Sequence, residues 1–138
     1  MALTDPVADF LTRIRNASNA RKENVDVCSS RLISEILRIL KQERYILNYK
    51  QLEEGQKGLP RVKNRYRVYL RMTRKGEPVI QGISKISKPG LRIYADVNKL
   101  AKIRRHLGVA VVSTSKGIMT DKEARKNKIG GEVVCRIW

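Results

Sequence analysis

Five consecutive residues have side chains that could do chemistry: Ser113, Thr114, Ser115, Lys116 and Gly117. Three hydroxyls beside a lysine could supply a nucleophile with its general base, because an amine with a lowered pKa can take a proton from a serine. The same residues could form a polar contact surface, since short hydroxyls donate and accept hydrogen bonds with little side-chain entropy to lose. These interpretations predict different molecules, an acyl-transfer enzyme and a binding protein.

The enzyme interpretation depends on the spacing of Ser113 and Lys116, which matches the S-x-x-K signature of serine acyltransferases related to the penicillin-binding proteins. In those enzymes the serine opens a helix, and S-D-N and K-T-G motifs complete the site. Here the serine follows the apolar run 109–112, Gly117 follows the lysine directly, and neither companion motif is present. The chain also lacks the G-x-x-x-x-G-K-S/T phosphate loop of nucleotide hydrolases. The sequence therefore predicts that the protein is not an enzyme.

The overall charge favours a binding protein. The 138 residues include 30 Lys and Arg against 13 Asp and Glu, which gives a formal net charge of +17. A polyanionic partner relieves such an excess, and nucleic acid is the leading candidate. An anionic membrane is the alternative, but the basic residues are spread over many predicted elements and no apolar run approaches the ~20 residues of a membrane helix. We expect a soluble, intracellular protein with no membrane partner and no small-molecule substrate.

The cysteines and the histidine do not predict a metal site. Cys28 and Cys135 stand far apart without CxxC spacing, and His106 is the only histidine, so a tetrahedral zinc site cannot be built. We expect no metal and no cofactor. Both thiols are predicted to face a core in a reducing compartment, and His106 to lie on the surface.

The first half of the chain predicts α-β-α-β-β. Asp5 can cap the first helix and Pro6 fits its first position. Near the end of this half, apolar residues alternate with arginines and Tyr69, which predicts a strand with Tyr66, Val68, Leu70 and Met72 on its buried face. The expected elements are a helix over 4–17, a strand over 25–28, a helix over 31–44, a strand over 45–49, a polar turn over 50–61 and a strand over 65–72.

The second half predicts a mainly β unit with short helices. Gly76 and Pro78 interrupt both periodicities, so we expect subdomains over 1–76 and 77–138 and an α+β fold class. Residues 79–90 fit a short helix or an irregular strand equally well. The expected elements beyond them are a strand over 91–97, a basic helix over 98–108, a buried strand over 109–112, a helix over 121–128 opened by a T-x-x-E capping box, and a strand over 132–138.

Basic and aromatic residues accompany the hydroxyl run. Residues 61–75 contain seven basic side chains and no acid, with Tyr66 and Tyr69 interleaved. Lys88, Arg92 and Tyr94 follow, so guanidinium groups and aromatic rings are available to stack on unpaired bases. This pattern indicates a nucleic-acid partner.

Several details of the hydroxyl run fit that partner. Lys116 could neutralise a phosphate, Gly117 permits a close backbone approach, and the helix start around Asp121 and Lys122 could turn N–H groups outward. The alternative is an ordinary polar loop followed by a helix cap. A general nucleic-acid chaperone or DNA-packing protein is a further possibility, and it would bind duplex DNA and irregular RNA about equally.

Three segments of the chain resemble a known family. TDPVADFLTRIRNA, ISKPGLRIY and LGVAVVSTSKGIMTDKEARKNKIGGEVVCRIW are similar to the bacterial and organellar family of small-subunit ribosomal protein eight. The similarity runs nearly end to end and excludes 47–80. The resemblance implies a two-part fold and a structural role in the small ribosomal subunit, with ribosomal RNA of its central domain and other ribosomal proteins as partners, in the bacterial cytoplasm or in an organelle.

The resemblance also implies roles for individual residues. The hydroxyl run, Ser113 to Lys116, would face the RNA, with Glu132 and Tyr94 nearby, and the start of the first helix would add Thr4, Asp5 and Arg13. Glu132 could orient neighbouring hydroxyls or accept a hydrogen bond from a base, or it could only form an ion pair with Arg125 or Lys126. Some bacterial relatives also bind their own messenger RNA to repress translation, and the sequence leaves this open here.

Overall fold

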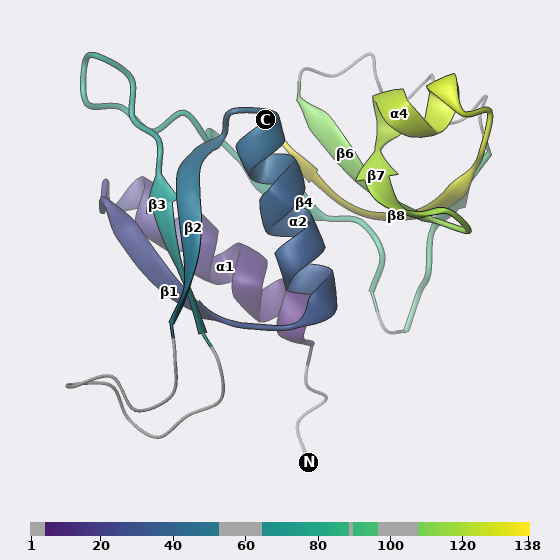
Figure 1. Ribbon diagram of the computed structural model, residues 1–138, viewed down its shortest axis with the longest axis horizontal. Helices are drawn as coiled ribbons and strands as arrows, with labels where there is room; N and C mark the ends of the chain where they lie inside the picture. Colours follow the sequence, from purple (N-terminus) through teal and green to yellow (C-terminus); the bar gives the residue numbers. More distant parts are fainter. Residues whose placement is uncertain (1–4, 53–64, 89, 97–107) are drawn as a thin grey trace. The chain divides into compact units, whose positions relative to one another are not determined.

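The computed structural model describes residues 5–52, 65–88, 90–96 and 108–138. The chain divides into two compact units, Met1–Ile80 and Gln81–Trp138. Each unit combines helix with antiparallel sheet, which confirms the α+β fold class (Figure 1).

The first unit ends after Ile80, whereas the sequence placed the boundary after Gly76. Residues 71–80 fold back on themselves: the Thr73 N–H donates to the Glu77 carbonyl at 2.7 Å, and the Val79 N–H donates to the Arg71 carbonyl at 3.0 Å. The buried Ser18 hydroxyl then donates to the Ile80 carbonyl at 3.1 Å. These bonds keep the segment with the first unit. The division into subdomains over 1–76 and 77–138 stays a prediction.

Helix α1, Pro6–Asn19, begins directly after the predicted cap Asp5 and ends two residues beyond the expected end at 17. The Asp5 carboxylate accepts a hydrogen bond from the Ala8 N–H at 3.1 Å, and Pro6 occupies the first turn, where its missing N–H has no partner to lose. The apolar face at helical spacing is buried: Val7, Phe10, Leu11, Ile14 and Ala17.

Helix α2, Arg31–Gln42, is the second core helix. The Ser30 hydroxyl caps it by accepting from the Ile33 N–H at 3.1 Å. Its apolar stripe is almost wholly inaccessible to solvent and consists of Ile33, Ile36, Leu37, Ile39 and Leu40. Burial of this size is the main source of stability for a helix of this length.

The helices pack on one face of a three-stranded antiparallel sheet with the order β1-β3-β2. Its strands are β1, Asn24–Cys28, β2, Ile46–Leu52, and β3, Arg65–Leu70. Val27 and Val68 are buried on the covered face, as expected. Tyr66 and Met72 are only half-buried, and Met72 lies outside β3, so the predicted alternation holds over fewer residues. The predicted turn 50–61 is in part wrong because β2 continues to Leu52, and the remainder lies outside the described residues.

The second unit is a five-stranded antiparallel sheet. Its path is β4-β8-β6-β7, with β5 pairing on another part of β8. The strands are β4, Ile83–Lys85, β5, Tyr94–Ala95, β6, Val109–Thr114, β7, Gly117–Thr120, and β8, Gly131–Ile137. Segment 79–90, left open by the sequence, therefore contains a strand.

Several expected boundaries in this unit were wrong. The strand predicted over 91–97 is only the two residues of β5, and β7 was not predicted at all. Helix α4, Asp121–Lys126, starts at the expected capping box, where the Thr120 hydroxyl accepts from the Glu123 N–H at 3.1 Å. It ends earlier than expected because Asn127 caps it and Lys128 takes a positive φ of 55°. His106 and residues 98–107 of the predicted helix 98–108 lie outside the described residues.

The core of the second unit lies on one face of its sheet, with Ala124 of α4 packed against it. Its members are Ala95, Ala110, Val112, Met119, Ala124 and Val133, with Ile86 at the edge. Asp121 is buried, and its carboxylate accepts a hydrogen bond from the Ala110 N–H at 3.3 Å. The Asp121 side chain thus ties α4 to β6, while the outward direction of the N–H groups at this helix start stays a prediction.

The two thiols are predicted to react at different rates. Cys135 is buried, and burial raises its pKa to about 12, whereas Cys28 is exposed, which corrects the expectation that both face a core. At about pH 8 a thiol reagent should modify Cys28 rapidly and spare Cys135, since the thiolate is the reactive form. Mass spectrometry of the native protein should show one fast adduct, lost in Cys28→Ser, and a second adduct only in denaturant. Equal labelling of both thiols in the native protein would contradict the burial of Cys135.

Candidate nucleic-acid interface

The hydroxyl run forms a tight β-hairpin, in which Ser115 and Lys116 are the two turn residues between β6 and β7. Thr114 pairs with Gly117 across the turn. The Thr114 hydroxyl donates to the Gly117 carbonyl at 2.8 Å and accepts from the Lys116 N–H at 3.1 Å. Gly117 has a φ of 113°, a conformation that side chains disfavour. We call residues 113–117 the serine hairpin.

The hairpin geometry excludes the acyltransferase interpretation. Ser113 lies within β6 and Lys116 lies in the turn, so no helical turn places the amine beside the serine hydroxyl. Within the described part of the chain, the hydroxyls of Ser113 and Ser115 make no hydrogen bond, and Ser115 and Lys116 are exposed. These groups are available to a partner, whereas Thr114 is engaged in holding the turn.

Three of the predicted residues lie side by side across the sheet. In the strand register Tyr94 of β5 faces Glu132 of β8, and Glu132 faces Ser113 of β6. Directly paired residues of adjacent strands point to the same face of a sheet. We call these three residues the binding row. Gly131 lets the strands approach, because a Cβ at this position would collide with the Ser113 carbonyl.

Glu132 pairs with Arg92, not with Arg125 or Lys126 as the alternative proposed. The Arg92 guanidinium donates to the Glu132 carboxylate at 3.1 Å, with the two side chains 52% and 20% exposed. An exposed pair of this kind contributes little to stability. Its effect is positional, because the carboxylate holds a guanidinium beside the binding row.

A buried serine supports the loop that carries Lys88 and Arg92. The Ser87 hydroxyl accepts from the Ile93 N–H at 2.9 Å and donates to the Ile93 carbonyl at 3.3 Å. Lys88 and Leu91 exchange two backbone hydrogen bonds of 2.9 Å, which close the loop. Tyr94 remains 66% exposed. The hydrogen bonds of Ser87 thus anchor the loop that carries two cations, and β5 presents the aromatic ring next to it.

Lys85 belongs to the same cluster and was not predicted. It pairs with Cys135 in the register of β4 and β8. Partial burial lowers the pKa of Lys85, and repulsion from Arg92 and Lys88 lowers it further. The clustering of three cations around Glu132 produces a site that an anion would stabilise. Lys85 could not be predicted as a site residue, because the sequence did not decide whether 79–90 is helix or strand.

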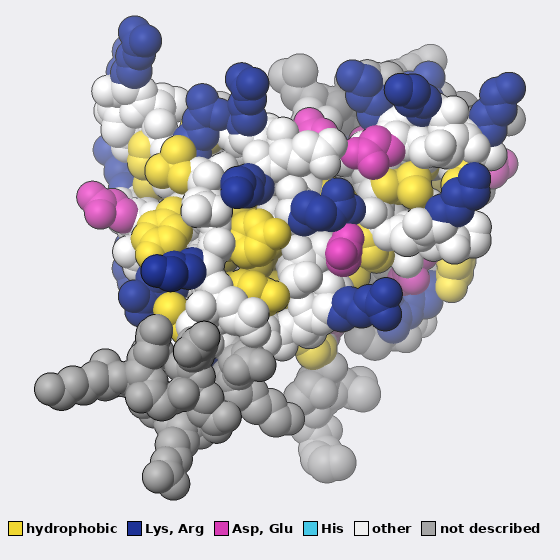
Figure 2. Space-filling view, viewed as in Figure 1, with side chains coloured by type: hydrophobic (Ala, Val, Ile, Leu, Met, Phe, Trp, Pro, Cys, Tyr) yellow, Lys and Arg dark blue, Asp and Glu magenta, His cyan; other side chains and the backbone are white. Residues whose placement is uncertain are grey.

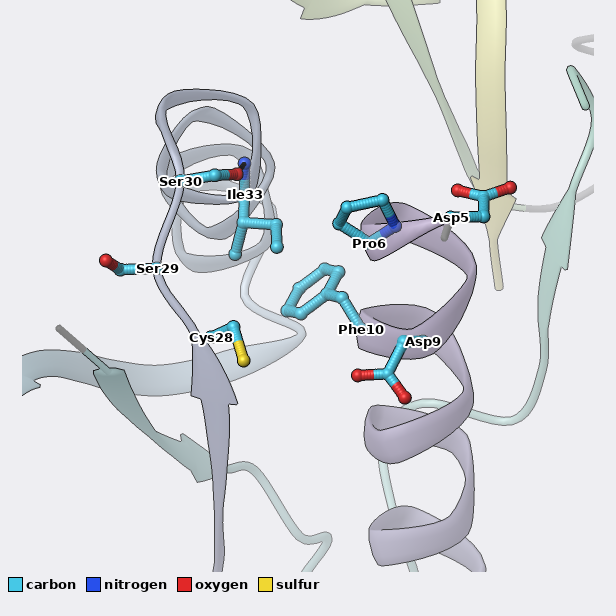
Figure 3. A pocket seen from close by; sticks show the side chains of 8 residues that line it. All are labelled: Asp5, Pro6, Asp9, Phe10, Cys28, Ser29, Ser30 and Ile33. Atoms are coloured by element: carbon cyan, nitrogen blue, oxygen red, sulfur yellow. Dashed lines mark hydrogen bonds between the residues drawn. The ribbon is translucent and has the colours of Figure 1, made fainter. Parts of the chain in front are cut away.

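The remaining predicted residues belong to the N-terminal unit. Asp5 caps α1, and Arg13 forms an exposed pair with Asp9 at 2.9 Å that raises its pKa. Thr4 lies outside the described residues. A pocket of about 460 Å³ opens beside the start of α1, with Phe10 pointing into it and the Asp9 carboxylate at its side (Figure 3). Its lining residues are Asp5, Pro6, Asp9, Phe10, Cys28, Ser29, Ser30 and Ile33.

The comparison with known proteins identifies the family of the chain. The model of the family described as Ribosomal protein S8 matches residues 5–138. The chain belongs to this family. It is 48% identical over 138 residues to the small ribosomal subunit protein uS8 of Clostridioides difficile, with 100% of both chains covered. It is 50% identical over 135 residues to the protein of the same name from Kosmotoga olearia, with 98% of each chain covered.

Membership of the S8 family confirms the resemblance read from the sequence. It makes the chain a structural constituent of the small ribosomal subunit and not an enzyme. The relatives that match over their full length include the uS8 proteins of Clostridioides difficile, Halothermothrix orenii and Halalkalibacterium halodurans. Their proteins are ribosomal and bacterial, and this chain is likewise associated with the ribosome.

The surface of this S8 family member is dominated by cations. Figure 2 shows Lys and Arg side chains distributed over the visible face of both units, with fewer Asp and Glu between them. No helix in the described ranges is long and apolar enough to cross a bilayer. A dispersed positive surface is typical of proteins that contact phosphates at many points.

Proposed function

We propose that this S8 family member binds a folded segment of ribosomal RNA in the central domain of the small subunit and supports the assembly of that region. The observation that carries the proposal is the placement of the binding row next to the serine hairpin. Tyr94, Glu132 and Ser113 are neighbours on one sheet face, and Ser113 leads directly into the turn. Lys85 of β4 and Lys88 and Arg92 of the loop before β5 add positive charge beside Glu132.

The chemistry of this surface suits an irregular RNA helix. Hydroxyls of Ser113 and Ser115 can bond ribose 2′-OH groups and phosphate oxygens, and the exposed Tyr94 ring can stack on an unpaired base. Glu132 has a second function besides holding Arg92, since a carboxylate oxygen can accept from a cytosine or guanine amino group. Lys88, Arg92, Lys116 and the newly assigned Lys85 neutralise phosphates, while Gly117 leaves room for the RNA backbone.

Thr4, Asp5 and Arg13 would provide a second contact at the start of α1. Asp5 is committed to its cap, so its contribution is to hold the helix start in shape. Arg13 can exchange its exposed partner Asp9 for a phosphate at little cost, because pairs of this kind are weak. The pocket beside them carries carboxylates, so we assign the main RNA contact to the C-terminal unit.

In the cell, this surface would be occupied by ribosomal RNA. The bacterial relatives support a place on the ribosome in a bacterial cytoplasm, with other small-subunit proteins as neighbours. Any segment of the chain's own messenger RNA that reproduced the shape of the ribosomal site would compete for the same surface. A DNA-packing protein would bind duplex DNA as tightly as structured RNA, so a competition assay with equal lengths of each separates the two functions.

Substitution of Ser115 tests the assigned surface. Ser115→Ala should weaken binding to a central-domain RNA fragment by about 1 to 2 kcal/mol, because one hydroxyl contact is lost while the fold is unchanged. Filter binding or calorimetry measures the effect, with circular dichroism as the check of folding. Ser34→Ala, on α2, is the matched control and should bind as the parent does. Normal binding by a well-folded Ser115→Ala would remove the serine hairpin from the interface.

A further inference from the structure

The outer face of the N-terminal sheet carries a second set of groups suited to nucleic acid. Val27 and Val68 face the helices, so the residues that alternate with them point to the other side. The register places Asn24, Tyr69 and Asn48 in one row across β1, β3 and β2, and Asp26, Arg67 and Lys50 in the next. Figure 2 shows hydrophobic and basic side chains interleaved over this unit.

Tyr69 is the centre of this face. It is half-buried, and the exposed Asn24 and Asn48 flank it on the two neighbouring strands. Among the described residues, none of these three side chains makes a hydrogen bond. Tyr66 differs, because it points to the opposite face and packs edge-on against Tyr49 with ring centroids 5.7 Å apart. Of the two tyrosines in the basic stretch, only Tyr69 is placed on the outer face.

The neighbouring row provides the positive charge. Arg67 is held by two hydrogen bonds to the Asp26 carboxylate, 2.9 and 3.2 Å long, which raise the pKa of the guanidinium. Lys50, next to it on β2, is exposed, and Arg65 continues the line along β3. Three cations against one carboxylate leave the face positive. This charge favours a polyanion over a basic protein segment.

We propose that this face binds single-stranded RNA, with one unpaired base stacked on Tyr69. Asn24 and Asn48 lie where their amides can donate to and accept from the edge of that base, and Lys50 lies where it can neutralise the adjacent phosphate. The inference goes beyond the proposed function, because it assigns a separate site, of different chemistry, to the other unit. The serine hairpin is assigned to a folded RNA helix, whereas this sheet face binds an unstacked RNA base.

Binding of a short, unstructured oligouridylate to the full chain tests the proposal. Tyr69→Ala should lower the affinity about tenfold at constant salt, as expected for one lost stacking contact. Tyr69→Phe keeps the ring and should bind as the parent does. Asn24→Ala and Asn48→Ala should change the preference among oligomers of different bases more than the affinity for any one of them. Fluorescence anisotropy measures all five proteins, and urea unfolding confirms equal folding.

The outcomes separate this proposal from the function of the C-terminal surface. Ser115→Ala should leave oligouridylate binding unchanged while weakening the folded RNA fragment. If a folded Tyr69→Ala variant bound oligouridylate as tightly as the parent, the proposal would be overturned. The face would then be either ordinary solvent-exposed surface or a docking site for a protein. Equal losses in Tyr69→Phe and Tyr69→Ala would also overturn it, because they would show that the hydroxyl and not the ring is used.

Discussion

The affinity for a central-domain RNA fragment should fall about 10³-fold between roughly 50 and 200 mM monovalent salt, as expected when six or more phosphates are neutralised. The reason is counterion release: each cation that contacts a phosphate frees a condensed ion, and the gain shrinks as salt rises. A net charge of +17 and the cluster of Lys85, Lys88 and Arg92 around Glu132 make several such contacts available. Binding isotherms over a salt series measure the slope.

Single substitutions distinguish the residues that contact phosphates from those that form neutral hydrogen bonds. Lys116→Ala should reduce the slope of log affinity against log salt by about 1, since one phosphate contact is removed. Ser115→Ala should lower the affinity and leave the slope unchanged, because a hydroxyl releases no counterion. An affinity that stays flat across the series would show that phosphate contacts do not dominate and would leave the charge of the chain unexplained.

Gly131→Ala should destabilise the C-terminal unit by about 3 kcal/mol, at the upper end of the range for overpacking. A methyl group at this position would collide with the Ser113 carbonyl and crowd the Val112 side chain, and neither the backbone nor a core residue can move freely. The strands β6 and β8 would have to separate where the binding row crosses them. RNA binding should therefore weaken together with stability.

Trp138, the only tryptophan, lies in the C-terminal unit beneath the Arg136 guanidinium, so its fluorescence during urea unfolding reports on that unit. Gly90→Ala is the matched control, because nothing lies within 4 Å of a Cβ at that position. The control should unfold at the same urea concentration as the parent. If Gly131→Ala unfolded at the same urea concentration as Gly90→Ala, the strands β6 and β8 would not lie as close together as described.

The candidate RNA surface is held in shape by contacts within the protein. The Thr114 hydroxyl closes the serine hairpin, Ser87 anchors the loop before β5, and Glu132 positions Arg92. Groups that are already ordered lose less conformational entropy when a ligand binds. The polar residues therefore have two roles: some organise the surface, and the side chains of Ser113, Ser115 and Lys116 remain available to the proposed RNA partner.

Local sequence was sufficient for helices α1 and α2 and for the start of α4. Asp5 and Thr120 cap their helices as predicted, because a cap requires only a short polar side chain and the backbone N–H groups three residues on. Ser30 caps α2 in the same way. The α-β-α-β-β order and the α+β class followed from helical and alternating apolar periodicity, which reflects burial on one face. The family was also evident from motifs in the sequence.

Pairing between distant strands decided the rest. Whether 79–90 forms a strand and how short β5 is depend on hydrogen bonds to β8, which no local pattern encodes. Strand β7 differs, because it completes a two-residue hairpin with β6, a local pairing that was not predicted. The same pairing set Tyr94, Glu132 and Ser113 side by side and placed Glu132 beside its partner Arg92. It also put Asn24 and Asn48 on the two sides of Tyr69, whose own face the alternation along β3 had already indicated. A residue type with its spacing specifies which groups are present, but only the register between strands specifies which of them meet.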